Sequence, residues 1–275
     1  DLATATADFN YVNRLAISPD GSTLLVATST GIHRSSNGGN TWTLVQTTAS
    51  RMTQVLFDPN DSTKAVAAGY AALVFYSTDR GLTWTAASGL PAAGTGSLPG
   101  RSELAYARSV AGTLYNGYWN NGTASLYKSI NGGQTYTQVA VSGSTNWMSA
   151  QGWYDNTIWV DPTDANRLIV GGLDLYRSTN GGANLTKIST WQSAPASAHA
   201  DHHGIINDPG YNGTTNTRVY FVNDGGIYKA ENALTVGTTG WTELNNNLGI
   251  TQFYGAAGNP TSLTVVAGAQ DNGSL

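Results

Sequence analysis

The chain has 275 residues, of which 11% are charged and 33 are glycine, with no cysteine and a formal net charge of −4. Few charges and many glycines favour short strands joined by tight turns over long solvated helices. Lys and Arg occur singly, which excludes the basic stripe of a nucleic-acid-binding protein, and no apolar run reaches the roughly 18 residues of a membrane-spanning helix.

A short phrase with the consensus Ser-x-Asn/Asp-x-Gly-x-Thr-Trp recurs at 35–42, 77–84, 129–136 and 178–185. Its interval of about 40 to 50 residues is the length of a four-stranded propeller blade. Strand-like runs flank each copy, so we predict a hairpin in which Gly supplies a positive φ and Asn or Asp bonds to turn amides. We expect its aromatic residues to pack between sheets, as Trp42, Trp84, Tyr136 and, in a degenerate fifth copy, Trp241.

Two further strands precede each hairpin. The first is a short apolar strand ending at Pro, which removes a ladder donor, at 15–19, 55–59, 158–162, 205–209 and 256–260, with a Pro-less copy at 104–108. The second follows at 23–28, 65–69, 113–118, 167–172, 218–222 and 263–269. Six first strands predict six blades, the last of which stops after its second strand.

We therefore predict an all-β protein, a β-propeller of four-stranded antiparallel blades at approximately 10–48, 49–98, 99–143, 144–197 and 198–248, with an incomplete sixth blade at 249–275. The chain is a single propeller domain or a fragment of a seven-bladed or larger one. We expect the remainder of the propeller in the same protein or on a second chain, because an open sheet edge favours aggregation unless it is covered.

The repeated phrase resembles the Asp-box, also called the bacterial neuraminidase repeat, over essentially the whole chain. Proteins with this repeat include sialidases, glycoside hydrolase family 74 and sortilin-type receptors. The strings at 199–203, 223–228 and 270–273 resemble a bacterial glycosyl hydrolase or sortilin-like branch. The resemblance implies the propeller fold, whereas the chemistry has to be argued from the site residues.

Two catalytic patterns implied by the resemblance can be compared with the residues. Sialidases have an arginine triad with a Tyr/Glu pair, for which this chain offers Arg14, Arg51 and Arg101 without a matching local motif. Family 74 hydrolases use two aspartates on opposite propellers, and one partial propeller supplies at most one of them. Neither pattern transfers a catalytic residue.

Strand direction places the first-strand starts and the turns after the second strands on one face of a propeller, opposite the repeated hairpins. Hydrolysis of a glycoside needs two carboxyl groups, one as a protonated acid and one as a nucleophile or base. On this face the candidates are Asp155, Asp201 and Asp224, with Glu103 in reserve. Asp201 and His203 alternatively hold a metal ion or only stabilise turns, and turn formation is the alternative for Asp224 and Asp271. No cofactor is required.

Aromatic side chains in loops on the same face favour a carbohydrate partner, because large rings stack on sugar rings. The predicted substrate-binding residues are Trp119, Trp147, Trp153, Tyr154, Arg101, His202, His203, Gln252 and Asp271. For the aromatic residues, packing between blades is the alternative.

We predict a secreted, carbohydrate-active propeller, because its low charge and its Thr, Ser, Asn and Gly content are typical of microbial secreted proteins. Its function is that of a glycoside hydrolase, or the propeller half of one, acting on a polysaccharide or oligosaccharide. The alternative is a non-catalytic propeller that binds a glycan or a peptide, as sortilin-type receptors do.

Overall fold

The computed structural model describes residues 9, 11–48, 50–92, 100–142, 146–249, 253–259, 261, 264–271 and 273–274. Five four-stranded antiparallel sheets follow one another along the chain, each a simple meander. The first two are β1 (Val12–Ile17), β2 (Leu24–Thr28), β3 (Gly31–Ser35), β4 (Thr43–Thr47) and β5 (Met52–Asp58), β6 (Asp61–Gly69), β7 (Val74–Ser77), β8 (Thr85–Ala86). Short fourth strands recur in the later sheets.

The third, fourth and fifth sheets repeat this order. Their strands are β9 (Arg101–Tyr106), β10 (Leu114–Asn120), β11 (Thr123–Ser129), β12 (Thr137–Gln138); β13 (Thr157–Val160), β14 (Leu168–Gly171), β15 (Leu175–Ser178), β16 (Thr186–Lys187); and β17 (His202–Asn207), β18 (Val219–Asn223), β19 (Gly226–Ala230), β20 (Thr242–Glu243). A 3₁₀ turn, η2 (Trp191–Ser193), connects the fourth and fifth sheets. The described helical turns are too short or too polar to cross a bilayer.

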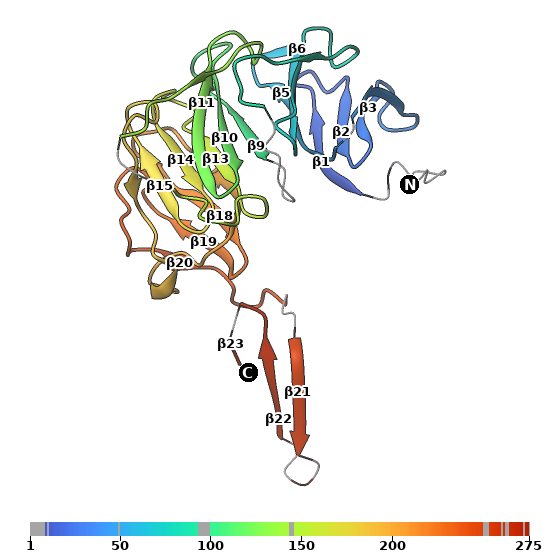
Figure 1. Ribbon diagram of the computed structural model, residues 1–275. Helices are drawn as coiled ribbons and strands as arrows, with labels where there is room; N and C mark the ends of the chain where they lie inside the picture. Colours follow the sequence, from blue (N-terminus) through green and yellow to red (C-terminus); the bar gives the residue numbers. More distant parts are fainter. Residues whose placement is uncertain are drawn as a thin grey trace.

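The first strands of neighbouring sheets contact one another in order, β1 with β5, β5 with β9, β9 with β13 and β13 with β17. Figure 1 shows the five sheets side by side in an arc. The all-β, blade-by-blade architecture predicted from the repeats is therefore confirmed, and the molecule is a partial β-propeller.

Each hydrophobic cluster lies between two successive sheets, because both faces of an inner blade are covered. In β6, Ala65 and Ala67 pack toward the first sheet while Val66 and Ala68 pack toward the third. The cluster between the third and fourth sheets contains Tyr115, Trp119, Trp147, Leu126 and Leu168. The cluster between the fourth and fifth contains Trp159, Ile169, Phe221, Tyr228 and Trp241.

The four repeated phrases form the same hydrogen-bonded loop between third and fourth strands. In the third sheet, Ser129 Oγ donates to Asn131 Oδ1 at 2.9 Å and accepts from the amide of Gly133 at 3.0 Å, while Asn131 Oδ1 accepts from Thr135 N at 3.0 Å. Equivalent bonds are present at Ser35, Ser77 and Ser178. The Ser and Asn or Asp of the phrase therefore satisfy turn amides, as predicted.

A sixth sheet has three strands, β21 (Phe253–Asn259), β22 (Thr264–Ala269) and β23 (Gly273–Ser274). The sequence predicted only the first two of these, and the short β23 corrects that expectation. Figure 1 shows β21 and β22 projecting away from the arc.

Candidate functional site

Three aspartates lie on one rim of the arc, where the fourth and fifth sheets meet. Asp155 ends the loop before β13, Asp201 directly precedes β17, and Asp224 lies in the turn between β18 and β19. The amide of Gln151 donates to Asp155 Oδ2 at 2.9 Å and also donates to Asp201. One side chain thus ties together two aspartates that belong to different sheets.

Asp155 and Asp201 form a coupled carboxyl pair. Asp155 has no exposed surface, and burial, followed by the charge of Asp201 and a hydrogen bond with it, raises the pKa of Asp155 to about 8. Burial also raises the pKa of Asp201, with the charges of Asp224 and Asp271 adding to the shift. Because two adjacent carboxyl groups cannot both ionise at low cost, the pair holds a shared proton at neutral pH.

The backbone at Asp201 is strained, with a φ of 63°. A residue other than Gly is uncommon at a φ in this left-handed region, and it persists there where the surrounding structure fixes the backbone. Here the next residue, His202, donates its main-chain N–H to the oxygen of Gly172 at 2.9 Å. The strained turn holds the Asp201 carboxyl beside Asp155.

Asp224 is held by a tyrosine and a histidine. The Tyr154 hydroxyl donates to both carboxylate oxygens, at 3.1 and 3.0 Å, and His203 Nε2 lies 2.7 Å from Oδ1. Burial, followed by the hydrogen bond to Asp224, raises the pKa of Tyr154 to about 12, so the hydroxyl keeps its proton. The Tyr154 and His203 rings pack edge to face, with their centroids 4.8 Å apart.

A register shift at the start of β17 explains the position of His203. His202 pairs with Asn223 and Gly204 pairs with Val222, which leaves His203 as the extra residue of a bulge. The same shift occurs at the starts of β1, β5 and β21. Bulges redirect side chains and are frequent beside functional sites, and this one brings His203 to Asp224.

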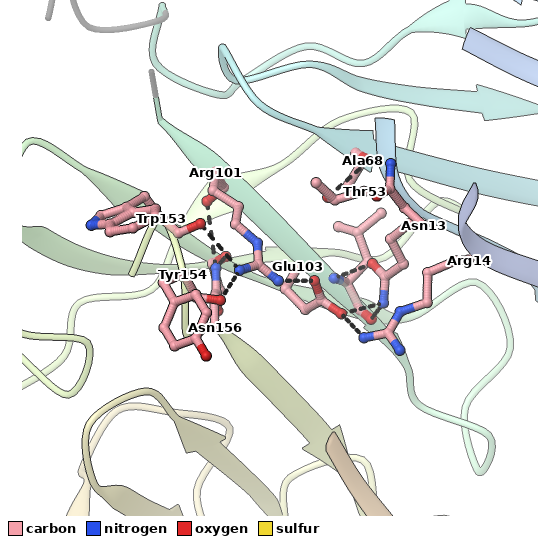
Figure 2. Close-up of polar contacts among 12 residues, drawn as sticks. Asn13, Arg14, Thr53, Ala68, Arg101, Glu103, Trp153, Tyr154 and Asn156 are labelled. Carbon is pink, nitrogen blue, oxygen red and sulfur yellow. Dashed lines mark hydrogen bonds and ion pairs between the residues drawn. The ribbon is translucent and has the colours of Figure 1, made fainter. Parts of the chain in front are cut away.

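The buried Glu103 side chain is engaged in a network of hydrogen bonds and ion pairs that includes Arg14 and Arg101 (Figure 2). Its oxygens accept from Arg101 at 3.3 Å, Arg14 at 3.4 Å and Gln54 at 3.0 Å. Arg101 also donates to the main-chain oxygens of Trp153 and Tyr154. Glu103 and Arg101, predicted as a reserve catalytic group and a substrate-binding group, thus brace the loop that carries Trp153 and Tyr154.

A cavity of about 540 Å³ lies between the first strands of the sheets. Its polar lining includes Arg14, Gln54, Glu103, His203 and Asn207. The cavity therefore runs beside the rim that carries Asp224.

Two of the four predicted stacking residues are on the surface. Trp153 and Tyr154 are 39% and 43% exposed, and their ring centroids are 5.7 Å apart. Trp119 and Trp147 are 2% and 1% exposed in the core between the third and fourth sheets, so the prediction that they bind substrate is wrong. Both faces of β10 are covered by neighbouring blades, which buries Trp119.

His202 is also misplaced by the sequence prediction. Its side chain is completely buried, so it cannot contact a substrate, and burial lowers its pKa to about 3, so the ring is neutral.

Asp271 lies exposed in the turn before β23, and its charge helps to raise the pKa values of Asp201 and Tyr154. Gln252 lies outside the described residues.

A metal site at Asp201 and His203 was one of the two alternatives to a catalytic role. Across the described ranges, no group of three or more His, Cys, Asp or Glu side chains is arranged to hold a metal ion. His203 instead bonds to Asp224.

Sequence reasoning missed Gln151, which bridges Asp155 and Asp201. The available signal was its place four residues before Asp155, a spacing at which a turn brings two side chains together. The amides of Tyr154 and Asp155 both donate to the Gln151 oxygen, at 2.7 and 3.1 Å, which forms that turn.

No family model and no curated protein matches the chain. Solved structures do resemble it. The GH74 xyloglucanase from Xanthomonas campestris is 19% identical with a TM-score of 0.69, over 95% of this chain and 43% of that one. An ancestral GH74 enzyme is 16% identical with a TM-score of 0.66, over 94% of this chain and 35% of that one.

A structure of YCF48 bound to D1 peptide is 15% identical with a TM-score of 0.57, over 96% of this chain and 76% of that one. The chain spans less than half the length of the two GH74 structures. Likeness at such low identity is a likeness of fold, and it agrees with the arc of antiparallel blades described above. The chain is a partial β-propeller.

Proposed function

We propose that this propeller is a secreted glycoside hydrolase, or the propeller half of one, with its active site at the rim of Asp155, Asp201 and Asp224. The observation that carries the proposal is the proton-sharing pair Asp155 and Asp201 beside a third carboxyl group, Asp224. Glycoside hydrolysis needs a carboxylic acid that is protonated at working pH and a second carboxylate.

The three aspartates take different roles in this proposal. Asp155 has no exposed surface, so it positions the proton while Asp201, which is partly exposed, presents it to the leaving oxygen. Asp224, held by Tyr154 and His203, acts as the nucleophile or as the base for water. The exposed rings of Trp153 and Tyr154 supply a stacking surface for a sugar.

The fold likeness to GH74 enzymes supports this choice of reaction class without assigning a substrate. Chemistry on a shared fold depends on the site residues, and this chain is less than one fifth identical to either GH74 structure.

The test is a reducing-sugar assay over a panel of polysaccharides, with Asp201→Asn and Asp224→Asn compared with the wild type. Loss of either group should lower turnover by on the order of 100-fold or more. Asp61→Asn, a change at a partly exposed aspartate of β6 that pairs with Lys64, is the matched control and should retain full turnover. Full turnover of every cleaved glycan by both rim variants would refute the proposal.

A binding propeller is the second candidate, and the cavity of about 540 Å³ favours it. The YCF48 structure that resembles this fold holds a peptide, and this chain covers 76% of it. A glycan or peptide bound without any product in the same assay would select this candidate.

A further inference from the structure

Asparagine followed by glycine is a reactive pair, because the glycine nitrogen can attack the asparagine side chain with no Cβ in its way. The attack needs a glycine N–H that is not engaged as a donor and a carboxamide that is free to turn toward it. Such pairs begin at Asn37, Asn116, Asn121, Asn131, Asn180, Asn212 and Asn272, the last of which lies outside the described residues. Because these pairs share one local sequence, the fold decides which of them reacts.

The pair in the third repeated phrase is blocked on both counts. Asn131 Oδ1 accepts from the main-chain N–H of Thr135 at 3.0 Å, and Asn131 Nδ2 donates to Thr135 Oγ1 at 2.8 Å. The attacking amide is also engaged, since Gly132 N–H donates to the main-chain oxygen of Gly112 at 2.8 Å. These hydrogen bonds have to break before Asn131 can react.

Other described pairs are restrained in similar ways. Asn37 Oδ1 and Asn180 Oδ1 each accept from the main-chain N–H four residues further on, at 3.0 and 2.9 Å. Asn212 Oδ1 accepts from the main-chain amides of residues 214–216. Asn116 has no exposed surface, so neither water nor hydroxide reaches it.

Asn121 and Gly122 are placed differently, in the two-residue turn where Asn120 on β10 pairs with Thr123 on β11. Their φ angles of 47° and 82° are typical of a tight hairpin turn. Asn121 is exposed, and neither its side chain nor the Gly122 N–H forms a hydrogen bond with any residue that the structure describes. Space around Gly122 is open, with no atom within 4 Å of an added Cβ. Both requirements for attack are therefore met at this turn.

We propose that Asn121 is a site of spontaneous deamidation, at which the chain converts this residue to aspartate and isoaspartate. After a base removes the Gly122 amide proton, the nitrogen bonds to Asn121 Cγ. The carboxamide C–N bond breaks, and its nitrogen takes up a proton and leaves as ammonia. Water then opens the cyclic imide at Cγ to give aspartate, or at the main-chain carbonyl carbon to give isoaspartate. One water is consumed for each ammonia released, and the proposed hydrolase activity plays no part.

The modified turn is connected to the loop that leads to the rim. Asn146 Nδ2 donates to the main-chain oxygen of Gly122, and Asn146 Oδ1 accepts from Ala124 N at 3.1 Å. Isoaspartate adds one atom to the main chain before Gly122, and either product adds a negative charge. Deamidation therefore changes the turn that Asn146 contacts.

The experiment follows the full chain during incubation at mildly alkaline pH, where base removes the amide proton. Samples are digested with trypsin and compared by mass spectrometry with an unincubated sample. Asn121, Asn131 and Asn180 fall in separate peptides, residues 109–128, 129–167 and 178–187. We expect conversion at Asn121 to be about tenfold or more faster than at the other two, because only they have to break hydrogen bonds first.

Two controls separate the effect of the fold from that of the local sequence. In concentrated urea, Asn121, Asn131 and Asn180 should react at similar rates, because their hydrogen bonds are lost. Gly122→Ala should slow conversion at Asn121 and leave the other two sites unchanged, because the added methyl group crowds the attacking nitrogen.

Equal rates at the three sites in the folded chain would overturn the proposal. A faster reaction at Asn121 that persists undiminished in urea would also overturn it, because the local sequence would then be the cause. An unchanged rate at Asn121 in Gly122→Ala would exclude attack by this nitrogen.

Discussion

At Asp155 a buried carboxyl group keeps its proton because ionisation would place a charge beside Asp201 without water. Its pKa is about 8 in the folded protein, against the ordinary value of 3.8 for an aspartate in the unfolded chain. The folded state therefore binds this proton more tightly, so the contribution to stability is fully present below about pH 4 and is lost as pH rises through about 8.

Asp155→Asn removes this titration while keeping the shape of the side chain. We expect the wild type to lose more stability than the variant between pH 4 and pH 8. Urea unfolding midpoints across that interval measure the difference. Parallel curves for the two proteins would mean that Asp155 is ionised in the folded state.

Trp153 and Trp119 separate a binding role from a packing role. Trp153→Ala removes a ring that is 39% exposed, so it should weaken glycan binding and change the free energy of unfolding little. Trp119→Ala removes a ring that is 2% exposed and should cost about 3 to 5 kcal/mol of stability. Glycan titration and urea unfolding of both variants test this, and a stability loss in Trp153→Ala as large as that in Trp119→Ala would contradict it.

Sequence position predicts which residues reach the rim only in part. Asp155, Asp201 and Asp224 lie where strand direction places them. Trp119 and His202 were misassigned because β10 is buried on both faces and because the bulge in β17 turns His203, and not His202, toward Asp224. The alternation of side chains between the two faces of a strand cannot show either effect. The first depends on the neighbouring blade, and the second depends on a shift of register.

At the scale of elements, the hairpin loops couple one blade to the preceding one. Gly133 has a φ of 87°, and a Cβ added there would lie 2.7 Å from Val66 Cγ1 on β6. Gly122 has a similar φ of 82° but open space around it. Gly133, the repeated Gly of the third copy of the phrase, is thus required both by the turn and by the close approach of β6.

Gly133→Ala and Gly122→Ala form a matched pair that separates these two requirements. Both replace a glycine of positive φ, at a cost of about 1 kcal/mol, and only Gly133→Ala also pushes against Val66, which should add about 1 to 3 kcal/mol. Urea unfolding of the two variants gives the difference. Equal losses would show that the loop does not press on β6.

The strands themselves were largely predictable, because a Pro-terminated apolar run, a second apolar run and the hairpin phrase repeat in fixed order. The second strand predicted at 113–118 appears as β10 (Leu114–Asn120), and that at 167–172 as β14 (Leu168–Gly171). The very short β23 was missed, since two residues carry no periodic pattern.

For the whole molecule, the repeats predict an arc of blades but not how its ends are covered. Large apolar side chains are exposed at both ends of the arc, Leu15 and Ile17 on β1 at 59% and 58%, and Ile206 on β17 at 61%. Between the ends, each blade buries such residues against its neighbour. Closure depends on contacts between blades that no single repeat encodes.

The sixth sheet provides the last prediction. Its main contacts are among β21, β22 and β23, and it projects from the arc (Figure 1). A variant ending at residue 249 should therefore unfold at the same urea concentration as the full chain. A variant ending at residue 199 should be strongly destabilised, because it loses Phe221, Tyr228 and Trp241 from the hydrophobic cluster between the fourth and fifth sheets. If removing residues 250–275 also lowered the midpoint, the sixth sheet would have to pack against the exposed Ile206 of the fifth sheet in solution, and the arc would be longer by one docked blade.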